Sequence, residues 1–167
     1  MFKVDFVLAQ SDALYSQYMF NQFTINPAYA GSRDALSGVL LYRSQWTGIE
    51  DAPKTVNVSV HSPFHKKNMA LGVNMMTDQI GPTSIQSLAG TYAYHLKTNY
   101  GDLSMGLRSG VISLQSNESL LNFYNDQYES NQTISVVIPN FDFGLYFFTD
   151  MFYAGASVSH ILEDELI

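Results

Sequence analysis

The sequence predicts an all-β fold: an antiparallel transmembrane β-barrel of the outer-membrane type, with about seven strands present. Three observations predict it. From Leu36 onward, apolar residues recur at every second position over successive segments, which is the period of a strand. Only 14% of the 167 residues are charged, against roughly 25% in average soluble domains. No apolar run approaches the roughly 20 residues of a transmembrane helix, so a membrane-spanning chain must cross as a closed barrel.

Two segments precede the expected sheet. Residues 1–10, MFKVDFVLAQ, are expected to be the remnant of a secretory signal peptide, because Lys3 precedes a short apolar run. The alternative is an ordinary mature N-terminus. Residues 11–35 are polar and aromatic, and Pro27 and Gly31 punctuate them. We therefore expect a lead-in that precedes the sheet, followed by a partial barrel over residues 36–167.

Seven strands are expected, at about residues 36–46, 55–61, 69–77, 85–97, 103–114, 141–148 and 152–160. In nearly every strand one face is large and apolar, whereas the other is small, polar or glycine. A soluble β-sandwich usually carries Lys, Glu and Thr on its outward face. Small polar residues instead suit the inside of a barrel. Aromatic residues near strand ends, such as Trp46 and Tyr153, resemble the interfacial girdles of outer-membrane barrels.

One set of polar residues is expected to face the barrel lumen. Its members are Arg43, Gln45, Asn57, His61, Asn74, His95, Arg108 and Asp142. They either line a channel or docking surface, or hydrogen-bond to one another and fill the interior. Arg43 or Arg108 could pair with Asp142.

The longest and the two shortest connections between the expected strands fall on the sides where an outer-membrane barrel has its long loops and its short turns. With the N-terminus in the periplasm, connections at about residues 47–54, 78–84 and 115–140 lie outside, and the last of these is the longest. Those at 62–68, 98–102 and 149–151 are periplasmic. Bacterial single-chain barrels have an even number of strands, so we expect the chain to be incomplete or to close with a second copy or a partner.

The sequence offers little for catalysis or metal binding. The chain has no cysteine, which excludes disulfides and thiolate chemistry. The four histidines form no metal-binding pattern, and neither a metal nor another cofactor is expected. His61 and Ser62 could serve as base and nucleophile of a lipase, but we favour a turn serine before Pro63. The net charge of −7, with no basic cluster beyond Lys66 and Lys67, argues against nucleic acid as a partner.

Several short motifs share a common order and spacing. They are carried by Tyr18, Phe20, Asn21, Asn26, Pro27, Ala28, Tyr29, Gly31, Tyr42, Arg43, Gln45, Trp46, Gly48, Pro53, Lys54, Thr55, Gly81, Pro82 and Thr83. In this the sequence resembles the PorP/SprF family, type IX secretion system membrane proteins of Bacteroidetes-type bacteria. Family members are typically about twice this length.

The resemblance implies a non-enzymatic outer-membrane barrel in contact with outer-membrane lipids. Its expected partners are the type IX secretion machinery, including periplasmic ring and motor proteins, and secreted proteins with C-terminal sorting domains, such as gliding adhesins. Three alternatives remain: a porin-like passive channel, a lipase based in the lumen or loops, and a soluble β-sandwich.

Overall fold

The computed structural model describes residues 21–46, 48–49, 52–64, 68–117 and 133–161. These residues form one antiparallel sheet whose seven strands follow the order of the chain. The strands are β1 (Ser37–Ser44), β2 (Lys54–Phe64), β3 (Met69–Ile80), β4 (Thr83–Thr98), β5 (Gly101–Asn117), β6 (Thr133–Phe148) and β7 (Tyr153–Val158). The prediction of an all-β antiparallel half-barrel is therefore confirmed.

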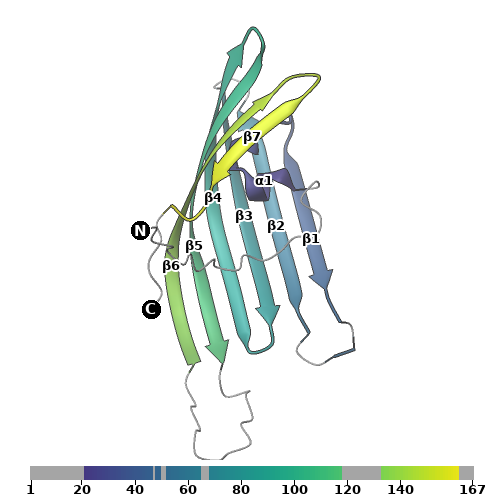
Figure 1. Ribbon diagram of the computed structural model, residues 1–167, viewed down its shortest axis with the longest axis vertical. Coiled ribbons are helices and arrows are strands. Elements are labelled where there is room, and N and C mark those ends of the chain that lie inside the picture. Colours follow the sequence, from purple (N-terminus) through teal and green to yellow (C-terminus); the bar gives the residue numbers. More distant parts are fainter. Residues whose placement is uncertain (1–20, 47, 50–51, 65–67, 118–132, 162–167) are drawn as a thin grey trace, which may run out of the picture.

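Each strand pairs with the next through a hairpin, so the connections alternate between the two ends of the sheet (Figure 1). The β1–β2, β3–β4 and β5–β6 connections share one end, which we call the loop end. The other three connections share the opposite end, the turn end. Gly48 and Gly81, both at the loop end, have φ values of +102° and +56°, a left-handed region that glycine adopts without strain.

The two faces of the sheet differ in the way that the alternation predicts. We call the face that carries Asn57, Asn74 and Arg108 the inner face, and the opposite one the outer face. On β3, Gly72 and Asn74 project to the inner face and are buried, Asn74 being only 6% exposed. Val73, which lies between them, projects to the outer face and is 53% exposed. Large apolar side chains thus lie outside and polar ones are buried, the reverse of a soluble sheet.

Two expectations about the strands were wrong. The sixth strand begins at Thr133 rather than near Phe141, so residues 133–140, together with 115–117, belong to strands and not to the long connection; residues 118–132 lie outside the described part. The inner face is also not polar throughout. Near the loop end it carries half-buried apolar side chains on neighbouring strands, namely Ile85, Ile112, Leu114, Val136 and Ile138. Alternation fixes which face a residue occupies, but not the chemistry of that face along its length.

The lead-in does more than precede the sheet. Residues Asn21–Gly31, which we call the plug segment, contain a one-turn helix α1 (Gln22–Ile25) and a 3₁₀ turn η2 (Pro27–Tyr29). The plug segment lies across the inner face (Figure 1). Its Phe23 and Ala30 form a small buried apolar cluster with Ala70 and Ala93 of the strands. The expected signal remnant, residues 1–10, lies outside the described residues.

Candidate functional site: a seat for the plug segment

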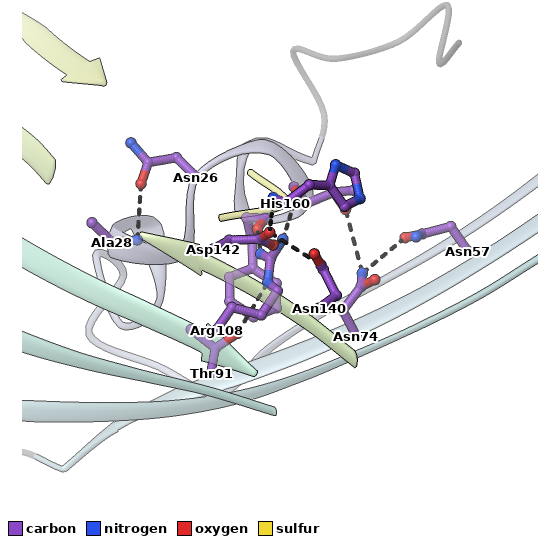
Figure 2. A network of polar contacts seen from close by, with 11 residues as sticks. Asn26, Ala28, Asn57, Asn74, Thr91, Arg108, Asn140, Asp142 and His160 are labelled. Atoms are coloured by element: carbon purple, nitrogen blue, oxygen red, sulfur yellow. Dashed lines mark hydrogen bonds and ion pairs between the residues drawn. The ribbon is translucent and has the colours of Figure 1, made fainter. Parts of the chain in front are cut away.

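Arg108 on β5 belongs to a network of polar contacts on the inner face (Figure 2). Its guanidinium donates to the carbonyl oxygen of Thr24 at 2.7 Å and to that of Phe23. Its Nε donates to Thr91 Oγ1 at 3.2 Å, and its Nη1 lies 3.4 Å from Asp142 Oδ2. The guanidinium also stacks 5.1 Å from the ring centre of Phe23. The buried cation is thus neutralised by a carboxylate and shared with the main chain of α1.

Asp142 on β6 joins this cation to the end of β7. It lies directly opposite Arg108 in the β5–β6 register, so the pairing of the two strands brings the charges together. Its Oδ1 accepts from Asn140 Nδ2 and from the backbone N–H of His160, both at 3.1 Å. Figure 2 shows these contacts converging on the carboxylate. One network therefore links the plug segment to the residues that follow β7.

Asn26 links the plug segment to two strands through its side chain. Its Oδ1 accepts from the Ala28 N–H at 2.9 Å and so caps η2, a role for which Asn is well suited. Its Nδ2 donates to the carbonyl oxygens of Leu145 on β6, at 2.9 Å, and of Ala156 on β7, at 3.4 Å. One side chain both shapes the turn and attaches it to two strands.

The strands bind the second half of the plug segment through its main chain. Ser104 Oγ donates to the Ala28 carbonyl at 2.6 Å. His95 Nε2 contacts the Ala30 carbonyl at 2.9 Å, so this nitrogen carries the hydrogen. The Gly31 N–H donates to His61 Nδ1 at 3.1 Å, so that nitrogen is an unprotonated acceptor.

The first residue of the plug segment is held by amides and hydroxyls of β2. Asn21 Nδ2 donates to Asn57 Oδ1 at 3.0 Å and to Ser59 Oγ at 2.9 Å. Asn74 Nδ2, on β3, lies 3.5 Å from the same Asn57 oxygen and 3.4 Å from Thr24 Oγ1. The polar inner residues of β2 and β3 therefore exchange hydrogen bonds with the plug segment rather than only with one another.

Glycines on the inner face make room for the plug segment. A Cβ atom at Gly72 would lie 2.5 Å from Phe23 Cζ. At Gly106 it would meet the backbone of Ala28, and at Gly144 the side-chain oxygen of Asn26, both closer than real Cβ atoms come. The three glycines lie on β3, β5 and β6, each beneath a different residue of the segment. We call this surface, with the polar residues around it, the seat.

The sequence-predicted lumen residues separate into two groups. Six of them, Asn57, His61, Asn74, His95, Arg108 and Asp142, are buried on the inner face and belong to the seat. Arg43 and Gln45 do not. Arg43 lies on the edge strand β1, in a cross-strand row with Thr55 and Asp78, so the suggested pairing of Arg43 with Asp142 on β6 is wrong. The Gln45 N–H donates to the Pro53 carbonyl at 3.0 Å, at the loop end.

Sequence reasoning missed several residues of the seat. Asn26, Thr91 and Ser104 were not among the expected lumen residues, although each is buried. The available signal was the Asn-Pro pair, which favours a turn, together with glycines on the otherwise polar face of the strands. Since the plug segment has no strand or helix period, its docking partners leave no trace in the local pattern.

The positions that carry the family resemblance gather in two places. Those from Asn21 to Gly31 form the plug segment, whereas Tyr18 and Phe20 lie outside the described residues. Those from Tyr42 to Thr55 and from Gly81 to Thr83 lie around the first two hairpin connections of the loop end.

The histidine and serine considered for a lipase are engaged elsewhere. His61 accepts from the plug segment and packs its ring 5.0 Å from that of Phe23. Ser62, next along the strand, points its hydroxyl to the Pro63 carbonyl. Adjacent strand residues project to opposite faces, so the two side chains do not converge. Within the described residues, no group of His, Asp and Glu side chains is arranged to hold a metal ion.

No helix among the described residues is long and apolar enough to cross a bilayer.

Comparison with known proteins gives one clear result. No curated protein and no solved structure matches the chain significantly. The family model for type IX secretion system membrane proteins PorP/SprF, however, matches residues 7–167. Since this match covers nearly all of the sequence, the chain belongs to the PorP/SprF family of type IX secretion system membrane proteins.

Proposed function

We propose that the chain is an outer-membrane component of the type IX secretion system, acting in secretion, surface anchoring or motor coupling of secreted surface proteins. Its partners would be the secretion machinery and proteins with C-terminal sorting domains, gliding adhesins among them. The observation that carries the proposal is that this member of the PorP/SprF family has a sheet with an exposed apolar face and a buried polar face.

The outer face supports a place in a bilayer. Leu71, Val73 and Met75 on β3 are each about half exposed, and Leu107 on β5 is 57% exposed. An apolar face of this extent is unfavourable in water and is the surface that a barrel presents to lipid. Outer-membrane lipids are therefore the proposed surroundings of this face.

The seat supports an anchoring or coupling role over passive transport. A porin lumen is lined by polar side chains that face water. Here Arg108, His95 and Asp142 are buried, and their hydrogen bonds go to the plug segment or to neighbouring strands. An inner face covered in this way by a segment of the chain weighs against the porin-like alternative, and a set of side chains engaged in main-chain contacts weighs against catalysis.

The proposal is tested by deleting the gene in its own bacterium and restoring it on a plasmid. We expect the restored protein in the outer-membrane fraction, and secretion of a reporter with a C-terminal sorting domain only in the restored strain. A plasmid that encodes the Gly90→Ala variant should restore secretion equally well, because a Cβ atom at this position meets nothing within 4 Å. Unchanged secretion after deletion would refute the role. A large, stable conductance of the purified protein in planar bilayers would favour the porin instead.

A further inference from the structure

The plug segment is joined to the sheet by an exposed linker. Residues 33–36, between Gly31 and the start of β1, are exposed, and Leu36 is 72% exposed. No strand pairing holds this linker, since the β1–β2 register begins at Ser37. Within the described residues, the plug segment is therefore attached by contacts within the seat and by this exposed linker, the tether, on its C-terminal side.

The seat recognises a conformation and a pattern of small residues. Arg108, Ser104 and His95 donate to main-chain carbonyls, which any sequence able to adopt the same two turns would offer. Specificity comes from Asn26, which donates to carbonyl oxygens on β6 and β7. It also comes from the glycines of the seat, because their missing side chains let the plug segment lie close to the strands. A ligand of the seat would thus carry an Asn-Pro-small turn with an aromatic residue three positions before the Asn.

The buried cation of the seat keeps partners on the strands when the plug segment leaves. Arg108 would keep Asp142 and Thr91 as partners, so its charge is not left without a counter-ion, the case that is strongly destabilising. The remaining contacts are mostly hydrogen bonds, and water can replace the partners that the plug segment supplies, so the net loss for each bond is small. The shared apolar cluster is small, being formed by Phe23, Ala30, Ala70 and Ala93 with Tyr29 beside it.

We propose that the seat is a peptide-binding site and that the plug segment is its displaceable internal ligand. The external ligand is a segment of a second polypeptide that presents the same Asn-Pro-Ala-Tyr-Ala-Gly turn. It binds in the seat when the plug segment dissociates from the strands, to which the linker of residues 33–36 still joins it. The main-chain contacts and the fit over Gly72, Gly106 and Gly144 then form between the seat and the second polypeptide.

The experiment replaces residues 33–35 with a specific protease site in the full chain reconstituted in lipid vesicles. After cleavage, a fluorescent peptide with the sequence of residues 21–32 is added, and its anisotropy is measured. We expect saturable binding to the cleaved protein and at least tenfold weaker binding to the uncleaved one, because a tethered ligand competes at an effective concentration on the order of millimolar.

Two matched peptides test the specificity. An Asn26→Ala peptide loses the hydrogen bonds to Leu145 and Ala156 and should bind about tenfold more weakly, the factor that corresponds to ~1.4 kcal/mol. A Tyr29→Phe peptide keeps the ring that packs on His61 and Tyr146 and should bind like the parent.

Three results would overturn the proposal. The cleaved segment could stay on the protein after extensive dilution and admit no labelled peptide. The Asn26→Ala peptide could bind as tightly as the parent. The sheet could lose its β circular dichroism once the segment departs, which would make the segment a structural core. None of these results depends on secretion in cells, so failure here is distinguishable from failure of the proposed secretion role.

Discussion

Arg108 shows how one residue can serve both the sheet and the segment that covers it. Its place opposite Asp142 is set by the β5–β6 register, and its remaining donors reach the carbonyls of α1. The side chain is buried within a membrane protein, where an unpaired charge is expensive. Its partners therefore decide whether this region of the inner face is stable.

Replacing Arg108 with Leu should destabilise the protein by about 3–5 kcal/mol, because Asp142 would remain buried without its counter-ion. Unfolding by urea in lipid vesicles, followed by tryptophan fluorescence, measures the change. The double variant Arg108→Leu, Asp142→Leu should recover part of the loss, since neither charge is then left alone. A single variant as stable as the wild type would show that the pair contributes nothing.

The glycines allow a sharp comparison between the two faces. Gly106→Ala would force a methyl group into the backbone of Ala28, whereas Gly90→Ala adds one to open space. We expect about 1–3 kcal/mol of destabilisation for the first, typical of overpacking, and little change for the second. The same unfolding measurement compares them. Equal stabilities would mean that the plug segment does not occupy the seat.

At the scale of elements, the strands could be predicted from the sequence but the plug segment could not. Val56, Val58 and Val60 alternate with smaller residues, and period two is enough to assign both a strand and its faces. The start of β6 was missed because residues 115–140 are rich in Asn, Ser, Tyr and Gln, which suggests a long loop. Pro139 is compatible with a strand because β6 pairs only with β5 at this position, and proline is tolerated on edge strands. The helical turns of the plug segment span four and three residues, too few for a helical period to appear.

The candidate site was predictable only in part, for the same reason. His61, His95 and Arg108 stood out because a strand face can be deduced from alternation alone. Besides the side chains that Arg108 contacts on β4 and β6, their partners are main-chain atoms of Gly31, Ala30 and the α1 turn. Such contacts depend on tertiary packing and not on the identity of a neighbouring side chain.

Asn26 should contribute measurably to the stability of the docked plug segment. An Asn26→Ala variant loses the cap of η2 and both links to β6 and β7, which should destabilise this segment by about 1–2 kcal/mol. Hydrogen exchange at the amides of Ala28 and Ala30 should then accelerate roughly tenfold, while amides of β4 and β5 keep their rates. Uniform acceleration across the sheet would instead indicate global destabilisation.

At the scale of the whole molecule, the distribution of apolar and polar side chains over the two faces is the reverse of that in a soluble sheet. Its outer face is apolar on successive strands, while most of its buried polar and charged side chains lie on the inner face. This arrangement suits a bilayer and predicts where a charge can be tolerated.

A lysine placed on the outer face should reveal the bilayer directly. Val73→Lys lies near the middle of β3 on this face, and should cost about 2–4 kcal/mol if that face meets hydrocarbon. Tyr100→Lys, at a turn position that is 88% exposed, is the matched control and should change stability little. Urea unfolding in vesicles measures both. A Val73→Lys variant as stable as the control would place the face in water.

The long reach of Asn26 has a consequence for how the molecule is assembled. Its side chain contacts the carbonyl oxygen of Ala156, 130 residues further along the chain. Contacts between such distant positions form late, because the intervening chain must first be ordered. The plug segment precedes every described strand in the chain, yet its contacts with Leu145 and Ala156 require that the β6–β7 hairpin has formed. Docking of the plug segment should therefore follow the pairing of β6 with β7.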